Sequence, residues 1–496
     1  MNIQLDTRSI EDYRRFLRIK SLPQFSFVGG TAVVPDEYAD RLGCDCELPA
    51  STKYAPSAGL WDYQRDIARL AIQKRKFCVF ADCGLGKTLI FLEFARHAMK
   101  SIRRGQCVLI VSPLMVVEQT LQEAAKFYGD LMPIRQVRAN ELAQWLTSGS
   151  ERIGITNYDA LDDDTPRGRI GCLILDESSM LKSHYGKWGT KCIEMGRGVE
   201  WKMACTGTPA PNDRIEYANH AVFMDAYPTT NSFLSRFFVN RGQTGNRWEL
   251  KPHALEPFYR SLSHWCIFLT NPATYGWKDN CGNIPPIHVH IHDVGLTQEQ
   301  TEIVMARTNG LFVHNVGGIG SRSFLAQVAK GSHAGRDIGT LKPEFIRNLV
   351  SSWPNESTII WCIYNAEQET MRATFPNGLC IDGDTPYEDR RRMIAEFKSG
   401  ANRVLISKPK ILGFGLNLQV CTRQVFSGLQ DSYESYYQAV KRSNRVGSAH
   451  ALNVHIPVTD VERPMVETVL EKAHRVQSDT EEQERIFKRL STEAVQ

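Results

Sequence analysis

The sequence predicts an α/β protein built from two parallel-sheet units in tandem, and three observations support this fold class. First, short apolar runs typical of buried strands alternate with amphipathic helical segments over 51–225 and again over 341–460. Second, polar residues follow the ends of several of these runs, as expected where parallel strands end at one edge of a sheet. Third, the chain has 496 residues, which is too long for one hydrophobic core.

The other stretches are expected to be smaller additions to these two units. Residues 1–50 contain a short helical piece and predict an accessory region, and 461–496 predict charged terminal helices. Residues 226–340 predict a mainly helical insertion followed by a linker, with a glycine-rich piece at 316–320. Arginine and aromatic residues interleave over 221–277, which suits nucleic-acid contact and equally suits a packing layer with a solvated rim.

The composition excludes several classes of protein. It is that of a globular protein, with 42% hydrophobic and 23% charged residues, and the formal net charge is only +4. Any nucleic-acid surface must therefore be local. No stretch approaches 18 apolar residues and the N-terminus has no apolar core of a signal peptide, so we expect a cytoplasmic protein without membrane contact.

Two groups of residues offer metal sites as alternatives to simpler interpretations. The thirteen cysteines are scattered, and reduced, buried thiols are the expected state. Cys44 and Cys46 could bind zinc but have no second pair nearby. His288, His290 and His292 alternate along a predicted strand at 287–294, and a solvated strand face is favoured over a metal site there.

The stretch 77–95 predicts a phosphate-binding loop between a strand and a helix. Residues 77–80 are an apolar run, the loop 81–87 contains two glycines, and an almost continuously apolar helix follows from Thr88. In this arrangement backbone N–H groups wrap a polyphosphate at the helix N-terminus, where the helix dipole favours negative charge. The strict pattern opens with glycine, whereas this loop opens with Ala81.

Four side chains predict the chemistry of this loop. We expect Lys87 to reach the β and γ phosphates of ATP and the Thr88 hydroxyl to ligate Mg²⁺. Asp176 and Glu177 follow the apolar run 172–175, as an acidic pair does at the end of a buried strand. Asp176 is expected to bind the metal, and Glu177 to orient and deprotonate the attacking water.

The second unit has no phosphate loop but carries a helix with basic residues. Gln438, Arg442 and Arg445 are spaced by four and three residues, which predicts that they share one helical face. Such arginines stabilise γ-phosphate charge in the transition state. If each unit holds half of an ATP site, hydrolysis can open and close the cleft between the units.

The order of motifs resembles that of the superfamily 2 helicases and translocases, specifically their Swi/Snf-like branch. The resemblance covers about residues 55 to 460. The matching pieces are LWDYQ at 60–64, DCGLGKT at 82–88, SP at 112–113, TNY at 156–158, DESS at 176–179, TGTP at 206–209, GFGLNL at 413–418 and QAVKRSNRVG at 438–447.

The resemblance implies two RecA-like lobes, Mg-ATP hydrolysis stimulated by DNA, and movement along double-stranded DNA. It also implies a monomer, and the compact length and DESS box look most like bacteriophage members, with roles in replication, recombination or repair and with phage or host partner proteins. The nucleotide contacts that it implies are Gln64, Cys83, Gly84, Leu85, Gly86, Lys87, Thr88 and Gly415. The implied contacts to the DNA backbone are Ser112, Thr156, Asn157 and Asn417.

Two positions depart from the family pattern. Ser179 stands where the family has histidine, so the contact between the acidic pair and 206–209 is expected to be made differently. Ser448 stands where the family usually has glutamine.

Two other functions remain open from the sequence. One is a helicase that separates strands of DNA or RNA. The other is an ATP-gated DNA-binding scaffold with little turnover, against which the intact residues Lys87, Asp176, Glu177, Arg442 and Arg445 argue.

Overall fold

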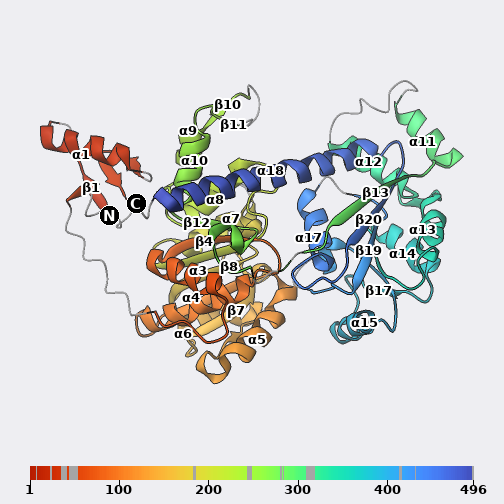
Figure 1. The fold of residues 1–496 in the computed structure, drawn as a ribbon, viewed down its shortest axis with the longest axis horizontal. Helices are drawn as coiled ribbons and strands as arrows, with labels where there is room; N and C mark the ends of the chain where they lie inside the picture. Colours follow the sequence, from red (N-terminus) through yellow and green to blue (C-terminus); the bar gives the residue numbers. More distant parts are fainter. Residues whose placement is uncertain are drawn as a thin grey trace. The chain divides into compact units, whose positions relative to one another are not determined.

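The computed structural model describes two compact units, each of which is α/β. Unit 1 comprises Met1–Asn280 and Asp479–Gln496, and unit 2 comprises Cys281–Ser478 (Figure 1). The described residues are 1–6, 8–22, 25–34, 42–43, 54–182, 186–242, 248–279, 282, 284–308, 319–412, 416–429 and 432–493. The predicted fold class, two parallel-sheet units in tandem, is confirmed.

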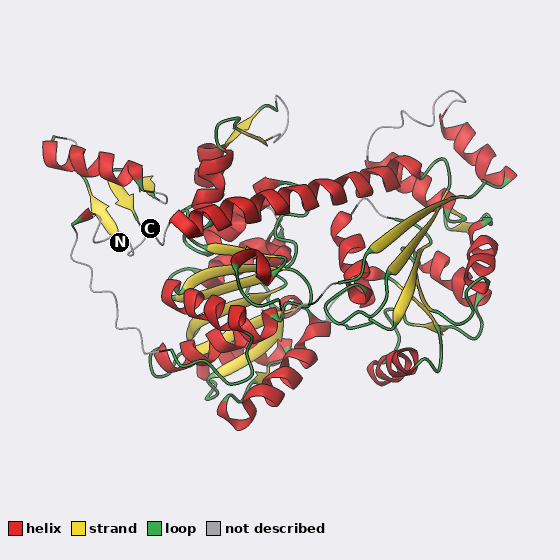
Figure 2. Ribbon diagram, in the orientation of Figure 1, coloured by secondary structure: helices red, strands yellow, loops and turns green. Residues whose placement is uncertain are grey.

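Unit 1 is built on a parallel sheet of seven strands in the order β12-β4-β9-β8-β5-β7-β6 (Figure 2). Consecutive residues of β4, β5, β8 and β9 are buried almost throughout, and because they point to alternate faces, both faces of the sheet are covered. The strands are β4 (Lys76–Ala81), β5 (Cys107–Ser112), β6 (Arg135–Gln136), β7 (Ile153–Asn157), β8 (Ile170–Asp176), β9 (Trp201–Thr206) and β12 (Cys266–Leu269).

The register of this sheet brings the predicted motifs to one edge. Phe80 pairs with Thr206 between β4 and β9, and Asp176 pairs with Cys205 between β8 and β9. The carboxyl ends of β4, β8 and β9 therefore meet, and so do the segments that follow them. The helices of this part are α3 (Asp62–Lys74), α4 (Lys87–Ser101), α5 (Leu114–Tyr128), α6 (Ala139–Ser148), α7 (Lys187–Gly196) and α8 (Tyr217–Phe223).

The aromatic stretch after α8 is mainly a packing layer. Helices α9 (Thr230–Phe237) and α10 (Leu255–Leu262) flank a hairpin of β10 (Phe238–Asn240) and β11 (Trp248–Leu250). The rings of Phe233, Phe237 and Phe258 are at most 1% exposed and meet edge to face at 5.3–5.9 Å. The expected helical insertion also contains β12, which joins the first sheet, and β13, which joins the second.

Unit 2 has a second parallel sheet, of six strands in the order β13-β20-β19-β16-β18-β17. The strands are β13 (Ile287–Asp293), β16 (Ser357–Trp361), β17 (Leu379–Cys380), β18 (Val404–Ser407), β19 (Cys421–Phe426) and β20 (Leu452–Val458). The helices are α11 (Gln298–Thr308), α12 (Ile319–Ala329), α13 (Lys342–Ser351), α14 (Asn365–Thr374), α15 (Tyr387–Ser399), α16 (Pro409–Leu412) and α17 (Tyr433–Ser443), and β14 (Ser332–His333) pairs with β15 (Arg336–Asp337).

The C-terminal segment is one long helix, α18 (Arg463–Glu493), which begins in unit 2 and ends in unit 1. Val466 and Val469 lie in a core cluster of unit 2. Ile486 and Phe487 lie in the main core of unit 1, where Phe487 meets Phe268 edge to face at 5.1 Å. The chain therefore passes between the units twice.

The N-terminal region forms a small antiparallel sheet with one helix. Its strands, in the order β1-β3-β2, are β1 (Asn2–Gln4), β2 (Ser26–Val28) and β3 (Thr31–Val33). Helix α1 (Ile10–Ser21) begins after Ser9, whose side chain accepts a hydrogen bond from the Asp12 N–H.

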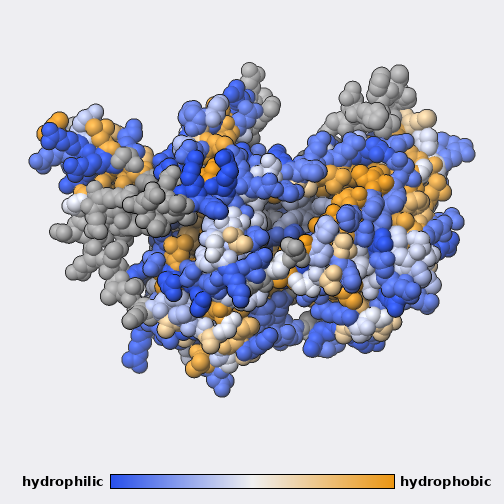
Figure 3. Space-filling view, viewed as in Figure 1, coloured by the Kyte–Doolittle hydropathy of each residue, from blue (hydrophilic) through white to orange (hydrophobic). Residues whose placement is uncertain are grey.

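The alternative metal sites gain no support within the described residues. Cys44 and Cys46 lie outside them, as do residues 316–318 of the expected linker. Among the residues that are described, no group of three or more metal-binding side chains could hold an ion, and no helix is long and apolar enough to cross a membrane. The edge strand β13 instead exposes Ile287, Val289 and Ile291, and apolar residues gather on this part of unit 2 in Figure 3.

Candidate nucleotide-binding site

The loop between β4 and α4 has the backbone geometry of a phosphate-binding loop. Gly84 and Gly86 have φ angles of 90° and 66°, a region that side chains rarely adopt. A Cβ on Gly86 would lie 2.2 Å from Nε2 of Gln64, so glycine is required there for space as well as for conformation. Ala81 is the last residue of β4, and its backbone is not among those with positive φ, so this position does not need glycine.

Lys87 begins α4 and folds back over the loop. Its Nζ donates to the carbonyl oxygens of Ala81 at 2.9 Å and Asp82 at 3.3 Å. Burial acts to lower the pKa of Lys87, but the Cys83 thiol and the nearby carboxylates, Glu177 among them, outweigh it and leave that pKa above its usual value. The ammonium is therefore charged and sits where phosphates would displace the carbonyl oxygens as its partners. Thr88 follows in the first turn of the helix.

Gln64 supports the loop from α3. This side chain is 2% exposed; its Oε1 accepts a hydrogen bond from the Trp61 N–H at 3.0 Å, and its Nε2 lies 3.5 Å from the Leu85 oxygen. Tyr63 donates to the same Leu85 oxygen at 2.9 Å. In this structure the amide of Gln64, predicted to contact the adenine base, is engaged within the protein.

The acidic pair lies at the end of β8. Ser112 Oγ donates to Asp176 Oδ2 at 2.9 Å, and the Glu177 N–H donates to Asp176 Oδ1 at 3.0 Å. Burial and the charge of Glu177 raise the pKa of Asp176 to about 7, against the lowering effect of Ser112 and Lys87. Glu177 adopts a left-handed backbone, with φ 50° and ψ 51°, which is uncommon for a residue with a side chain.

Residues 206–209 connect this pair to the loop. Thr206 Oγ1 donates to Glu177 Oε2 at 3.3 Å. The Thr206 hydroxyl also accepts a hydrogen bond from the Thr208 N–H at 3.1 Å. A Cβ placed on Gly207 would lie 3.8 Å from both Cys83 Sγ and Lys87 Nζ. The contact between the acidic pair and the TGTP motif is therefore made in this structure by Thr206.

A histidine from α8 lies beneath the acidic pair. His220 is fully buried, and its Nε2 is 3.0 Å from Ser178 Oγ. Burial lowers the pKa of His220 to about 4, so the ring is neutral. Ser179 Oγ turns back to the Glu177 carbonyl oxygen at 3.5 Å. His220 was not among the residues predicted from the sequence, because no motif or spacing marks it.

The predicted DNA contacts of unit 1 divide into two kinds. Ser112 and Thr156 are 0% and 2% exposed, and Thr156 Oγ1 donates to the Val137 oxygen at 2.8 Å. These two hydroxyl groups point inward and are not placed for the direct DNA contact that we predicted. Asn157 is half-buried, and its Oδ1 accepts from the Ala160 N–H at 2.9 Å.

The basic motif of unit 2 differs from the prediction in one respect. Gln438 and Arg442 lie in α17 and are 6% and 4% exposed. The helix ends at Ser443, so Arg445 does not share a helical face with them, and this part of the prediction is wrong. Asn444 leaves the helical conformation, with φ −100° and ψ 95°, and its Nδ2 donates to the Pro285 oxygen at 2.6 Å.

Ser448, where the family has glutamine, holds the turn that contains Arg445. The Arg445 N–H donates to Ser448 Oγ at 3.1 Å, and this hydroxyl donates to the Ser443 oxygen at 2.7 Å. The Arg445 side chain is half-buried. Gly415, a predicted nucleotide contact, lies outside the described residues, and Asn417 is exposed.

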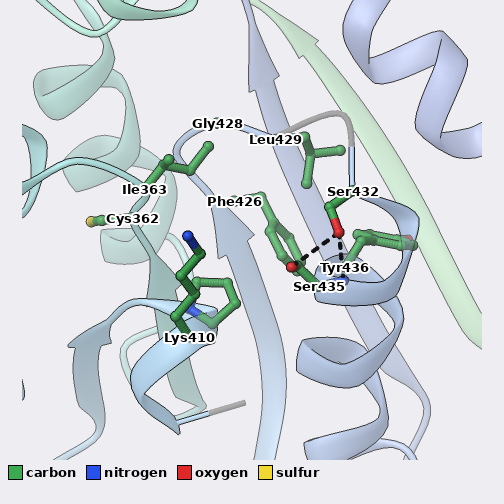
Figure 4. A pocket seen from close by; sticks show the side chains of 10 residues that line it. Cys362, Ile363, Lys410, Phe426, Gly428, Leu429, Ser432, Ser435 and Tyr436 are labelled. Carbon is green, nitrogen blue, oxygen red and sulfur yellow. Dashed lines mark hydrogen bonds between the residues drawn. The ribbon is translucent and has the colours of Figure 1, made fainter. Parts of the chain in front are cut away.

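A small pocket of about 50 Å³ lies where β16, β18 and β19 end (Figure 4). Ser432 caps α17, accepting from the Ser435 N–H at 3.3 Å, and Ser435 Oγ donates to Ser432 Oγ at 3.2 Å. Figure 4 shows the Lys410 side chain extending toward Ile363 across this pocket. The exposed cation of Lys410 therefore lies at the same edge of the unit 2 sheet as the predicted motifs.

In unit 1 a phosphate loop with its lysine meets an acidic pair from a neighbouring parallel strand, which defines the class of P-loop nucleotide hydrolases. Comparison with family models narrows this class. The model of the SNF2-related domain matches residues 63–334, and that of the helicase conserved C-terminal domain matches residues 341–447. The chain belongs to the SNF2-related family, and it is an ATP-hydrolysing enzyme of the helicase and translocase type.

Two individual proteins are similar to this chain. "Putative protein p41" of Acyrthosiphon pisum secondary endosymbiont phage 1 is 24% identical over 426 residues, which cover 78% of this chain and 89% of that protein. The structure of the Sulfolobus solfataricus SWI2/SNF2 ATPase core in complex with dsDNA is 19% identical, with a TM-score of 0.41, over 90% of this chain and 98% of that one.

Proposed function

We propose that this protein is a DNA-dependent ATPase that couples ATP hydrolysis to translocation on double-stranded DNA. The observation that carries the proposal is the meeting of three segments in unit 1. Lys87 and Glu177 follow β4 and β8, Thr206 ends the neighbouring strand β9, and a hydrogen bond and close approaches join these segments. ATP hydrolysis follows from membership of the family. The coupling of hydrolysis to movement along a DNA duplex is what we propose.

The residues present suit Mg-ATP. Asp176 is 4% exposed, and its burial, followed by the neighbouring charge of Glu177, raises its pKa to about 7, so a divalent cation would favour its ionised form. Asp176 and the Thr88 hydroxyl are the residues that would hold Mg²⁺, which neutralises phosphate charge when bound. Lys87 would bind the β and γ phosphates, and Glu177 would take the proton of the attacking water.

Unit 2 supplies the second half of the site in this proposal. Arg442 and Arg445 would contact the γ-phosphate in the transition state when the two lobes close around ATP. The turn fixed by Ser448 supports Arg445 in this role, because it restricts the backbone that carries the guanidinium. Gln438, which lies on the same helix as Arg442, would assist the two arginines in this role.

DNA would run over residues that keep polar groups near the surface. Asn157 is half-buried, Asn417 is exposed, and Lys410 is exposed beside the pocket of Figure 4. Lysine and asparagine side chains are suited to phosphate oxygens, which position a protein on DNA without reading sequence. The formal net charge of +4 agrees with a local DNA-binding surface.

The similar protein comes from a phage, which supports a phage setting, and within that setting we propose a role in DNA replication, recombination or repair. The protein would then act as a monomer in the cytoplasm of a bacterial host, with phage or host replication and recombination proteins as its partners.

Steady-state ATP hydrolysis with and without duplex DNA tests the proposal. We expect DNA to stimulate turnover of the wild-type protein, and we expect Lys87→Ala and Glu177→Gln to reduce the stimulated rate by about a hundredfold or more, because each removes a group that acts on the transferring phosphoryl group or its water. Lys126→Ala is the matched control, since Lys126 lies at the end of α5. Full activity of either site variant would refute the site.

A strand-displacement assay separates the leading proposal from the alternative helicase. Separation of forked DNA or RNA duplexes by the wild-type protein would favour the strand-separating helicase. Tight DNA binding with no stimulated turnover would instead favour the ATP-gated scaffold.

A further inference from the structure

The two passages of the chain between the units are both tied, on the side of unit 1, to the phosphate loop. The chain leaves unit 1 after residue 280 and returns to it at residue 479. In each case a segment of unit 1 near the boundary contacts an element that in turn contacts residues 82–85 of the loop. The two contact routes use different residues and reach the loop at different points.

The returning passage reaches the loop through Glu484 of α18. Glu484 is 7% exposed, and its Oε1 accepts hydrogen bonds from both the backbone N–H of Thr270, at 2.6 Å, and the Thr270 hydroxyl, at 2.5 Å. Thr270 follows directly on Leu269, the last residue of β12, whose oxygen accepts from the Asp82 N–H at 2.9 Å. A buried carboxylate is thus two hydrogen bonds away from Asp82 of the loop.

β12 is well suited to transmit this contact. It is the edge strand of the sheet and pairs with β4 alone, in a register that places Leu269 opposite Ala81. It has only four residues, so its position depends strongly on the loop that follows it. Burial raises the pKa of Glu484, and the charge of Asp82 acts in the same direction, which agrees with their proximity.

The departing passage reaches the loop through α3. The Lys278 N–H donates to Asp62 Oδ2 at 2.8 Å, and Trp277 Nε1 donates to Asp66 Oδ2 at 2.9 Å. Both carboxylates belong to α3, on which Tyr63 follows Asp62 directly and donates its hydroxyl to the Leu85 oxygen at 2.9 Å. The segment before the unit boundary is thus held to the helix that supports the other side of the loop.

We propose that Glu484 and Asp62 are positioning residues that convey the state of unit 2 to the phosphate loop. When DNA binding displaces unit 2, the two passages pull on β12 and on α3, and the loop adjusts its grip on ATP. The inference rests on the proposed function, and it assigns the regulation of the same site. A shift of about 1 Å at a catalytic group is enough to change turnover strongly.

The other contacts of α18 make this proposal testable without loss of the helix. Asp479 pairs with Arg214 at 2.6 Å, Gln483 reaches the hydroxyl groups of two tyrosines, and Ile486 and Phe487 lie in the core. These contacts remain when Glu484 is replaced. Glu484→Ala removes the acceptor for Thr270, whereas Glu484→Gln keeps an amide oxygen in the same place.

The experiment compares ATP hydrolysis with and without a blunt DNA duplex, and it reports kcat and KM separately. In Glu484→Ala and Asp62→Ala we expect the ratio of DNA-stimulated to basal kcat to fall about tenfold, within the range by which single residues alter coupling between sites. Glu484→Gln and Asp62→Asn should restore the ratio to within about twofold of wild type. Thr270→Val keeps the backbone N–H but removes the hydroxyl, so the ratio of DNA-stimulated to basal kcat should fall by less than in Glu484→Ala.

Arg489→Ala is the matched control, because it removes an ion pair of the same helix, to Glu256 at 2.9 Å, that is not on either route to the loop. An unchanged ratio in both alanine variants, or an equal loss in Arg489→Ala or Glu484→Gln, would overturn the inference. A wild-type protein that DNA does not stimulate would instead refute the proposed function, so the two failures are distinguishable.

Discussion

At the residue scale, the proposed catalytic role of Glu177 depends on its backbone conformation. Its left-handed backbone costs of the order of 1 kcal/mol or more for a residue with a side chain. That conformation turns the carboxylate away from the line of β8, and Oε2 meets Thr206 Oγ1 at 3.3 Å. Asp176 stays in the strand and is held by Ser112. The two neighbouring carboxylates thereby have different surroundings, which suits the separate roles that we propose for them, metal binding by Asp176 and proton removal by Glu177.

Gly86→Ala tests the geometry of the loop. The added Cβ would lie 2.2 Å from Gln64 Nε2 on a backbone with φ 66°. We expect the affinity for ATP, measured by equilibrium binding, to fall about tenfold or more, because strain of this kind costs roughly 1–3 kcal/mol. Gly105→Ala is the control, since Gly105 also has positive φ but a methyl group added there would meet no atom within 4 Å. Unchanged binding by Gly86→Ala would contradict the described loop.

The residues of the candidate site that belong to one local motif could be proposed from the sequence. Lys87, Asp176 and Glu177 were predictable because strand, loop and helix follow one another along the chain. A contact between the acidic pair and 206–209 was expected, but not that Thr206 makes it, and His220 was not predictable, because its segment lies beside Ser178 only through the fold. Ser112 was assigned to DNA by its motif, whereas its buried hydroxyl serves Asp176.

At the scale of elements, stacked histidines join the edge strand β13 to β20. The ring of His455 stacks on His290 and on Trp353, each with 4.7 Å between ring centres. Arg423 Nη1 lies 3.2 Å from His455 Nε2, and because arginine only donates, this nitrogen must accept. His455 is therefore neutral, and its Nδ1 donates to His292 Nε2 at 3.0 Å.

Unit 2 is expected to lose stability in acid because of His455. Burial, followed by the charges of His290, His292 and Arg423, lowers the pKa of His455 to about 3, although Glu356 acts in the opposite direction. Its unfolded value is about 6.5, so below that pH the unfolded chain binds more protons than the folded one. The stabilisation is complete above about pH 6.5 and is lost as pH falls toward 3, at up to about 1.4 kcal/mol per pH unit.

Urea unfolding midpoints at neutral and at mildly acidic pH measure this effect. His455→Phe keeps an aromatic ring in the stack but does not titrate, so its midpoint should depend less on pH than that of wild type. The same pH dependence in both proteins would show that His455 is not the responsible group.

The elements themselves were largely predictable, whereas their ends and partners were not. The strand of residues 287–294 and the helix that carries Gln438 and Arg442 were both expected. The spacing of Arg445 suggested one more helical turn, but Asn444 ends the helix through its bond to the Pro285 oxygen. That bond is made to a residue distant in sequence, so no local pattern indicates it.

At the scale of the whole molecule, the order of motifs was enough to predict two parallel-sheet units and the family. The return of α18 to unit 1 could not be predicted in the same way. Its apolar positions indicate a buried face, but the pattern does not say that Val469 packs in one unit and Phe487 in the other. For the same reason, the sequence could not show that β12 joins the sheet of unit 1 and β13 the sheet of unit 2.

The central claim is that ATP hydrolysis at this site drives movement along duplex DNA. The most direct measurement is displacement of a third strand from a DNA triplex that extends from a duplex loading arm. We predict that the wild-type protein displaces the third strand only with ATP and Mg²⁺ and leaves the duplex paired, and that Glu177→Gln binds the DNA but displaces nothing. Rapid DNA-stimulated hydrolysis with the third strand still in place would contradict the claim.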